Sequence, residues 1–195
     1  MIYPIVAYGH HVLRERAQAV ALDTDLQAFV ADMFATMDQA GGVGLAAPQI
    51  GKSWRLFVAD LRVFADPNVQ ADGLRKAYIN PKLRVQDATV QYEEEGCLSI
   101  PGVQIKVPRP KEVCIMYTAL DGSPRQEILH DLPARVIQHE YDHLDGKLCI
   151  DYATPLQRQI LQSKLAKIKM GKVEVPYRMH FAKQSVRSAT CTASE

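Results

Sequence analysis

The sequence has no apolar run long enough to cross a membrane as a helix, so helical membrane spans are not expected. Its charges nearly cancel. The formal net charge of +1 provides no field of one sign that would recruit nucleic acid or an anionic membrane. No internal repeat and no low-complexity linker divides the 195 residues, and a chain of this length is expected to form one domain.

Targeting segments and paired cysteines are also missing from the sequence. The first twenty residues lack the basic leader and apolar stretch of a signal peptide, and they lack the composition of a transit peptide. Because the cysteines are scattered and none forms a CxxC pair, a disulfide framework is not expected in a chain of this size. We therefore expect a cytoplasmic protein with reduced thiols. The four cysteines are Cys97, Cys114, Cys149 and Cys191.

The order of the expected elements is typical of an α+β fold. Apolar residues at helical spacing predict a helix from about Thr24 to Ala40, with Thr24 and Gln27 as a capping box and Gly41-Gly42 as its end. A strand is expected near Trp54–Ala59, followed by a polar loop at Asp66–Gly73. Five short strand-like segments come next: Lys76–Ile79, Ala88–Tyr92, Val103–Val107, Glu112–Ala119 and Arg125–His130.

Two further helices complete the pattern. Asp131 is a candidate N-cap for a helix that Gly146 ends, and Thr154 with Gln157 opens a last helix that runs to about Gly171. One helix, many strands and two helices predict short antiparallel or mixed sheets packed around a central helix, with an N-terminal and a C-terminal helix beside them.

The glycine-rich stretch Gly41–Gly51 contains Gly42-x-Gly44-x-x-Ala47, which partly matches a dinucleotide-binding fingerprint. That fingerprint must follow a strand and open a helix. Here a helix precedes the loop, and Pro48 follows it directly. The sequence therefore excludes a pyrophosphate site and leaves a tight loop of small residues that ends in the amide side chain of Gln49.

The second helix carries an HExxH motif from His139 to His143. Residues four apart lie on one face of a helix, so both imidazoles can bind one metal ion, and Leu132 and Val136 fall on the same stripe. Glu140 lies beside this stripe, close enough to serve a metal-bound water. A chance coincidence of two core histidines and a surface glutamate is the alternative interpretation.

Two histidines are too few for a catalytic site, which usually has three protein ligands. Cys149 occupies the position of the third ligand in a metzincin-like pattern, but it lies in an alternating, strand-like run where a thiol is usually buried packing. Cys97 lies between Gly96 and Pro101, where the backbone is expected to follow an unusual path. On its own sequence context, Cys97 is as compatible with core packing as with metal binding.

Three motifs together resemble the signature segments of the peptide deformylases, in the family's order and with its spacing. They are Gly42–Gln49 (GVGLAAPQ), Glu95–Ser99 (EGCLS) and Gln138–Gly146 (QHEYDHLDG). The resemblance extends from about Ile5 to Lys169, and no position within the motifs departs from the family pattern. We therefore expect a single metal-hydrolase domain over residues 1–170 and an extension over 171–195, to which the resemblance gives no role.

The resemblance implies hydrolysis of the N-formyl group from formyl-methionyl nascent peptides, with release of formate. It implies one divalent metal ion, natively Fe²⁺ and replaceable by Zn²⁺, Ni²⁺ or Co²⁺, bound by Cys97, His139 and His143. Such an ion lowers the pKa of its water so that hydroxide can attack the formyl carbon, while Glu140 acts as general acid and base.

The family's pattern also implies how the rest of the site works. The Gln49 side chain and the Leu98 N–H stabilise the oxyanion. The residues expected to contact the substrate are Val43, Gly44, Gly96, Leu132 and Val136, with backbone pairing at Val43-Gly44 and apolar walls for the methionine side chain. Arg135 is expected to be a solvated charge on the helix face or at the rim of the pocket.

The last helix is basic on a nearly neutral protein, and its expected apolar stripe comprises Leu156, Ile160, Leu165 and Ile168. A ribosome contact through residues 155–172 is one interpretation, and a solvated helix face is the other. Two alternatives to a deformylase remain. One is a zincin-type endoprotease with Cys149 or a later acid as its third ligand, and the other is a ribosome-associated protein with a structural metal, for which a fourth ligand is needed. The basic residues are Arg158, Lys164, Lys167, Lys169 and Lys172.

Overall fold

The computed structural model describes residues 1–21, 25–64 and 73–182. The expected capping residue Thr24, the polar loop up to residue 72 and Cys191 lie outside the described residues.

The main sheet has five strands in the order β2-β3-β4-β5-β6, and every neighbouring pair is antiparallel. A second sheet of two strands pairs the beginning of the chain with a late segment, in parallel. The predicted α+β class is confirmed. The strands are β1 (Ile5–Val6), β2 (Gly44–Ala46), β3 (Leu56–Asp60), β4 (Arg75–Cys97), β5 (Ile100–Thr118), β6 (Pro124–His130) and β7 (Met179–His180).

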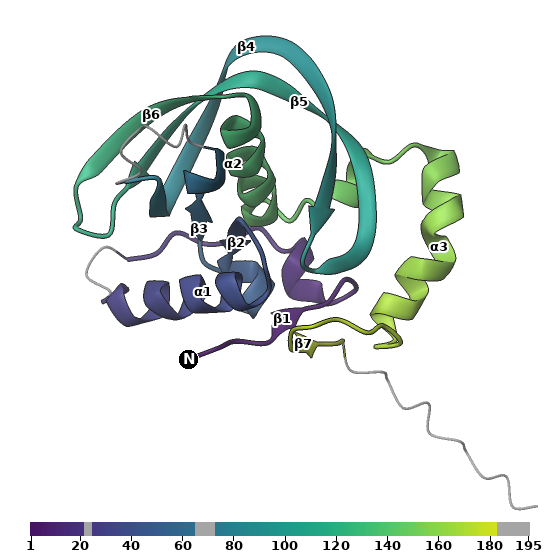
Figure 1. Ribbon diagram of the computed structural model, residues 1–195. Helices are drawn as coiled ribbons and strands as arrows, with labels where there is room; N and C mark the ends of the chain where they lie inside the picture. The colour runs from purple at the N-terminus through teal and green to yellow at the C-terminus, as the bar shows by residue number, and fades with distance from the viewer. Residues whose placement is uncertain (22–24, 65–72, 183–195) are drawn as a thin grey trace, which may run out of the picture.

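The four segments expected between Lys76 and Ala119 are not separate strands. They merge into β4 and β5, two long antiparallel strands that arch over the centre of the molecule in Figure 1. The proline and polar residues between the expected segments do not end the pairing, because shifts in register absorb them, as at Ile79/Lys82 and Val85/Asp87. The hairpin turn expected at Asp121–Pro124 joins β5 to β6, with Gly122 at a positive φ of 82°.

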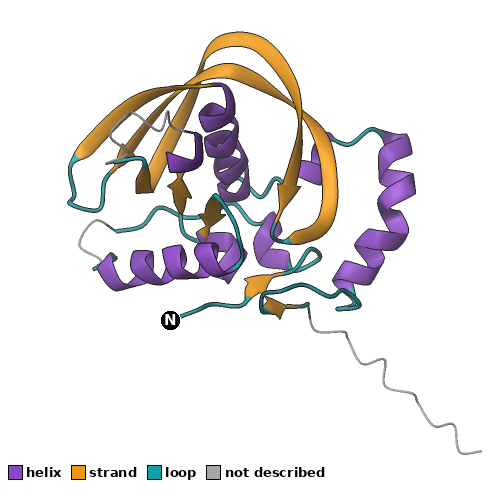
Figure 2. Ribbon diagram, in the orientation of Figure 1, coloured by secondary structure: helices purple, strands orange, loops and turns teal. Residues whose placement is uncertain are grey.

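In the described part of the chain, three α-helices accompany this sheet: α1 (Gln27–Gln39), α2 (Asp131–Leu144) and α3 (Pro155–Lys169). Helix α2 lies beneath the arch of β4 and β5, whereas α3 lies outside it (Figures 1 and 2). Four short 3₁₀ helices cover His11–Arg14, Ala47–Ile50, Leu61–Phe64 and Cys149–Tyr152. Among the described residues, no helix is long and apolar enough to span a membrane.

The helix ends follow their sequence signals with two corrections. Helix α1 begins at Gln27 with Leu26 as its N-cap, so Gln27 is not at the third helical position that the expected capping box with Thr24 requires. Thr154 and Gln157 form the expected capping box of α3, with the Thr154 hydroxyl accepting from the Gln157 N–H. The N-cap of α2 is His130 rather than Asp131, because Asp131 itself begins the helix with a left-handed φ of 51°. Gly146 follows α2 at φ 71°, the conformation expected of a glycine that ends a helix.

One expectation about a buried side chain is wrong. Cys149 opens a 3₁₀ helix instead of lying in a strand, although it is buried as expected. The apolar stripe of α3 is only partly buried: Leu165 and Ile168 pack in the core, whereas Leu156 and Ile160 are 66% and 70% exposed. Helix α3 therefore touches the body of the protein along a narrow strip, and it leaves apolar and basic side chains on its outer face.

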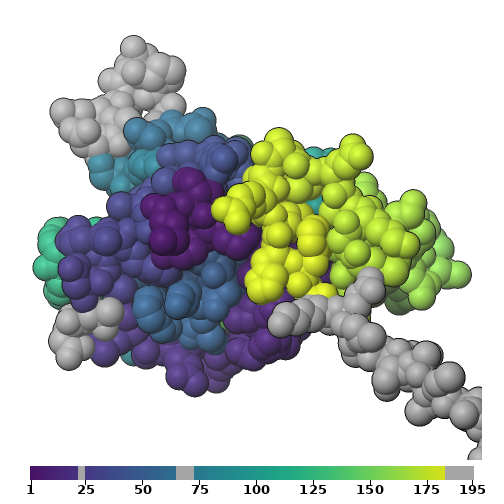
Figure 3. Space-filling view, turned by 90° about the horizontal axis from the view of Figure 1, so that it is seen from below, coloured from purple at the N-terminus to yellow at the C-terminus, as the bar shows by residue number. Residues whose placement is uncertain are grey.

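The segment after α3, Gly171–Ala182, returns to the body of the protein and is called the terminal segment below. Its strand β7 pairs with β1, through bonds from the Ile5 N–H to the Arg178 oxygen and from the Ala7 N–H to the His180 oxygen, both 2.8 Å. Seen from below, this segment lies against the N-terminal residues (Figure 3).

Candidate active site

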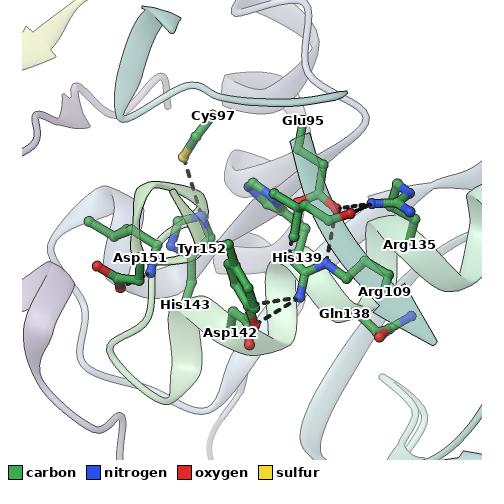
Figure 4. Close-up of polar contacts among 12 residues, drawn as sticks. Glu95, Cys97, Arg109, Arg135, Gln138, His139, Asp142, His143, Asp151 and Tyr152 are labelled. Carbon is green, nitrogen blue, oxygen red and sulfur yellow. Dashed lines mark hydrogen bonds and ion pairs between the residues drawn. The ribbon is translucent and has the colours of Figure 1, made fainter. Parts of the chain in front are cut away.

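The three expected metal ligands come together from two elements. Cys97 is the last residue of β4, and His139 and His143 lie one turn apart on α2. One donor atom from each residue lies within 4.8 Å of the others, and the Cys97 Sγ is 3.4 Å from His143 Nε2 (Figure 4). Cys149 does not belong to this group, so the arrangement favours Cys97 over the metzincin-like alternative.

Glu95, two residues before Cys97, orients His139. Its carboxylate accepts a hydrogen bond from His139 Nδ1 at 3.0 Å, which leaves Nε2 free to bind an ion. The same carboxylate binds Arg109 through two hydrogen bonds of 2.9 Å (Figure 4). Burial by itself raises the pKa of Glu95, but the hydrogen bonds from Arg109 and His139 outweigh it and hold the pKa at about 2.

Arg135 is not a solvated charge on the helix face; it lines the cleft of the candidate site, as the alternative interpretation of its sequence position expected, but it is buried. It is 5% exposed, and its guanidinium donates to Glu95 at 2.7 Å and to the Val107 and Gln91 carbonyls at 2.9 and 2.8 Å. It lies one helical turn before His139, on the face of α2 that carries the ligands. The buried Glu95 charge needs this second cation, since a buried carboxylate is stable only when it is paired and hydrogen-bonded.

Glu140 lies against Gly44 in strand β2. A Cβ atom at position 44 would lie 2.4 Å from Glu140 Oε1, so only glycine leaves room for this carboxylate. The residue is 4% exposed, and within the described part of the chain its Oε2 atom has no hydrogen-bond partner. Burial raises the pKa of Glu140 to about 7, a value suited to a group that accepts and returns a proton near neutral pH.

Gln49 is held so that its amide nitrogen faces the ligands. Its Oε1 accepts a hydrogen bond from the Ala46 N–H at 2.8 Å, which fixes the orientation of the amide. Its Nε2 therefore points to the Cys97 Sγ at 3.5 Å and to the Ser99 hydroxyl at 3.4 Å. With 1% of its surface exposed, Gln49 is a buried, oriented donor rather than a solvated loop amide.

Leu98 and Ser99 form the two-residue turn between β4 and β5, where Cys97 pairs with Ile100. Two distant residues hold this turn. The Tyr8 N–H donates to the Ser99 carbonyl at 2.8 Å, and the Tyr177 hydroxyl donates to the Leu98 carbonyl at 2.9 Å. The turn is therefore fixed by both ends of the described chain.

Most of these groups line a single cleft of about 1080 Å³, whereas His143, Arg109, Ser99 and Tyr8 lie outside its lining. The five residues expected to contact the substrate are in its wall, and Val43 and Leu132 expose 36% and 48% of their surface there. The terminal segment supplies another part of the wall. The lining includes Val43, Gly44, Gln49, Gly96, Cys97, Leu98, Leu132, Val136, His139, Glu140 and Val173–Tyr177.

The donor set suits a divalent ion of intermediate softness. A thiolate with two imidazoles accepts Fe²⁺, Co²⁺, Ni²⁺ or Zn²⁺. His143 has its Nδ1 buried without a partner among the residues described, and burial lowers its pKa well below the ordinary value. It is therefore neutral, as a metal ligand must be. The three residues thus fit a metal ion.

Comparisons with known proteins agree with this geometry. The family model described as polypeptide deformylase matches residues 2–159. The chain belongs to the polypeptide deformylase family. A curated peptide deformylase of Cytophaga hutchinsonii is 44% identical over 182 residues, which cover 93% of this chain and 98% of the relative.

Solved structures of the deformylase family also match the fold. The peptide deformylase from Legionella pneumophila has a TM-score of 0.76 at 38% identity, over 88% of this chain and 98% of that one. The Synechococcus elongatus enzyme in complex with actinonin has a TM-score of 0.73 at 37% identity, over 83% and 85% of the two chains. The chain is a metal-dependent hydrolase of this family, whose reaction is removal of the N-formyl group from nascent peptides.

Sequence reasoning missed four residues around the deformylase site: Glu95, Arg109, Ser99 and Tyr177. Glu95 and Ser99 lie inside a recognised motif, but nothing in the motif states what they contact. Arg109 and Tyr177 lie 12 and 80 positions beyond Cys97 and come close only in the fold. For Arg135 a signal existed, since its spacing of four from His139 places it on the ligand face.

Proposed function

We propose that Cys97, His139 and His143 hold one divalent ion, with Fe²⁺ as the resident metal by similarity to the family. Bound there, the ion supplies a Lewis acid that lowers the pKa of water and polarises the formyl carbonyl. The observation that carries the proposal is that these three donors lie within 4.8 Å of one another beside a cleft lined by the buried Glu140 carboxylate, whose Oε2 has no partner among the described residues.

Glu140 is the proposed proton carrier. Its free Oε2 atom accepts a proton from the attacking water, and the same atom returns that proton to the amine that leaves as the formyl C–N bond breaks. The raised pKa supports this role, because a group that titrates near 7 is available both as base and as acid at neutral pH.

Gln49 and Leu98 are the proposed oxyanion donors. The Gln49 Nε2 group is already oriented by Ala46, so little reorganisation is needed when charge develops on the formyl oxygen. The Leu98 N–H lies in the turn beside Cys97, and within the described residues it donates to no turn or loop carbonyl. Both donors line the cleft.

Strand β2 is the proposed docking site for the peptide backbone. In the described sheet β2 is an edge strand that pairs only with β3, so its other edge is open for an extended peptide. Val43, Leu132 and Val136 supply apolar surface in the same cleft for the methionine side chain. This arrangement supports a formyl-methionyl peptide as substrate.

Replacement of Glu140 by Gln tests the mechanism. The amide keeps the shape of the side chain but cannot carry the proton, so formate release from formyl-Met-Ala-Ser should fall by about 10²–10⁴-fold while the metal content stays near one ion per chain. Glu93→Gln, at an exposed position outside the cleft, is the matched control. Near-normal turnover of Glu140→Gln with bound metal would reject the assigned role.

We also propose that helix α3 contacts the ribosome in the cytoplasm, where nascent formylated chains emerge. Lys167 and Lys172 support this, because both are exposed and neither forms an ion pair with a described residue. Lys164 is less suited to such a contact, since its Nζ donates to the Gly102 carbonyl at the cleft. The outward positions of Leu156 and Ile160 add apolar surface to the same helix.

Reversal of the Lys167 and Lys172 charges to Glu tests this contact. The double variant should co-sediment with ribosomes more weakly than the wild type, with a difference that shrinks as salt rises, and should cleave a short formyl-peptide at the normal rate. Reversal of Lys76, which pairs with Glu127 on the main sheet, is a control for the loss of positive charge. Unchanged co-sedimentation of the α3 variant would reject the ribosome contact.

A further inference from the structure

The terminal segment lies beyond the part of the chain that the family model matches, yet it reaches the active-site cleft. Its residues Val173–Tyr177 line the cleft on the side of the Leu98 turn. Within this segment Tyr177 alone places a polar side-chain group on that turn, through the 2.9 Å bond from its hydroxyl to the Leu98 carbonyl.

The position of Tyr177 is fixed from both directions. Upstream, Gly171 adopts a φ of 72°, and the Lys172 N–H donates to the Lys167 carbonyl at 2.8 Å, which turns the chain back at the end of α3. Downstream, the carbonyl of the next residue, Arg178, accepts the 2.8 Å bond from the Ile5 N–H. The Tyr177 ring is half-buried and packs at the same apolar cluster as the Leu98 side chain.

The hydrogen bond from the Tyr177 hydroxyl is accepted by the Leu98 carbonyl, which belongs to the peptide unit between Leu98 and Ser99. Only the two backbone dihedrals of Leu98 separate its N–H from its carbonyl, so a donor that fixes the carbonyl also restricts the direction of the N–H. The Tyr8 N–H fixes the next carbonyl, that of Ser99. On the other side of Leu98 lies Cys97, held among the two histidines.

We propose that Tyr177 is a positioning residue for the deformylation reaction: its hydroxyl holds the Leu98 turn so that the Leu98 N–H stays directed at the formyl oxygen. The inference rests on the proposed oxyanion role of that N–H. The terminal segment then has a function in catalysis, because it places Tyr177 at the Leu98 turn.

Tyr177→Phe removes the hydroxyl and keeps the ring, so it separates positioning from packing. For the metal-loaded full-length protein, kcat for formyl-Met-Ala-Ser should fall about three- to tenfold while KM changes less than twofold, the pattern of an interaction that acts mainly in the transition state. Tyr92→Phe, at an exposed position on β4 outside the cleft lining, is the matched control and should behave like the wild type.

Hydrogen exchange provides a readout that does not depend on turnover. Amide exchange in the peptide that covers residues 96–99 should be faster in Tyr177→Phe than in the wild type or in Tyr92→Phe, because the turn has lost an anchor. A wild-type kcat and unchanged exchange in Tyr177→Phe would overturn the inference, since the ring alone would then be sufficient.

Gln49→Leu, measured in parallel, shows whether a negative result contradicts only the role of Tyr177 or also the proposed oxyanion donors. A reduced kcat in Gln49→Leu with a normal kcat in Tyr177→Phe overturns only the role of Tyr177. Normal kcat values in both variants remove the oxyanion assignment and the inference together. A reduced kcat in both, with faster exchange at residues 96–99 in Tyr177→Phe, supports both.

Discussion

Gly44 shows most directly how one residue shapes this site. The absence of a side chain at position 44 lets the Glu140 carboxylate lie against strand β2, where a Cβ atom would come within 2.4 Å of Oε1 and 2.7 Å of Cδ. The sequence explained the glycines of this loop by close approach of a peptide substrate. The structure adds another reason for Gly44, which is the room that the acid–base group itself requires.

Gly44→Ala should therefore impair catalysis more than folding. The clash falls on Oε1, Cδ and Cγ of one side chain, which must shift, so we expect a stability loss of about 1–2 kcal/mol. The displaced Glu140 should nevertheless lower kcat by about 100-fold. Kinetics and urea unfolding of the single variant measure the two effects.

A double-mutant cycle with Glu140→Gln supplies the control for that prediction. If alanine at position 44 acts by moving the carboxylate, adding it to Glu140→Gln should cause little further loss of kcat. Additive losses in the double variant would show that Gly44 matters for a separate reason, such as substrate pairing along β2.

A residue of the site could be predicted from the sequence where its spacing determines which residues surround it in the fold. His139, Glu140 and His143 were predictable because helical periodicity places them on adjoining faces of one helix. Cys97 remained undecided without the family resemblance, because a turn has no periodicity from which a neighbour can be inferred. The burial of Arg135 was not predicted because a charged residue on a helix was assumed to face water, although its spacing from His139 indicated otherwise.

Among the elements, β3 and β4 meet α1 through a group of charges centred on Asp60. Asp60 ends β3, is 8% exposed and accepts hydrogen bonds from Arg62 Nε at 2.8 Å and from Arg75 Nη1 at 2.6 Å. Arg75, the first residue of β4, also binds Asp38 in α1. The hydrogen bond from Arg62, followed by that from Arg75, lowers the pKa of Asp60 despite its burial.

Asp60→Asn should lower the free energy of unfolding by about 1–3 kcal/mol at pH 7, because the charge-assisted bonds are weakened. A carboxylate whose folded pKa lies below its unfolded value stabilises the protein above that unfolded value, 3.8 here, and loses this effect as the pH falls further. The difference in the free energy of unfolding between the wild type and Asp60→Asn should therefore become smaller as the pH is lowered from 4 toward 2.

Urea unfolding at a series of pH values measures this difference, with Glu93→Gln as an exposed control that should change little at any pH. A difference between Asp60→Asn and the wild type that stays constant down to pH 2 would contradict the assignment of the effect to the Asp60 charge.

The elements themselves were predicted unequally well. The boundaries of α2 and α3 follow from local caps and glycine ends, which act within a few residues and can be seen in the sequence. The extents of β4 and β5 could not be predicted, because a strand continues for as long as a partner is available, and the partner lies elsewhere in the chain. One expected strand ended at Ile79 and the next began at Ala88, but register shifts such as Ile79/Lys82 and Val85/Asp87 carry the pairing across this interval.

At the scale of the whole molecule, a metal ion at the proposed site would join the β4–β5 hairpin to helix α2. Because the ion binds the folded protein far better than the unfolded chain, a ligand at 100 times its dissociation constant stabilises the fold by about 2.7 kcal/mol. Removal of the metal by a chelator should therefore lower the melting temperature by about 5–10 °C. Differential scanning calorimetry with and without added Zn²⁺ measures this shift.

Variants of two of the three buried cysteines in the described part of the chain identify the sulfur ligand. Cys149→Ser should keep the metal-dependent shift in melting temperature, whereas Cys97→Ser should lose most of it, since only Cys97 belongs to the group of donor atoms. The opposite result, with the shift lost in Cys149→Ser and kept in Cys97→Ser, would restore the zincin-like ligand set.

The pairing of β1 with β7 has a consequence for how the protein is made. Ile5 is synthesised 174 positions before its strand partner Met179. Contacts between such distant residues form late in folding, because a long loop must close first. During translation, strand β1 therefore has no partner until Met179 has been synthesised.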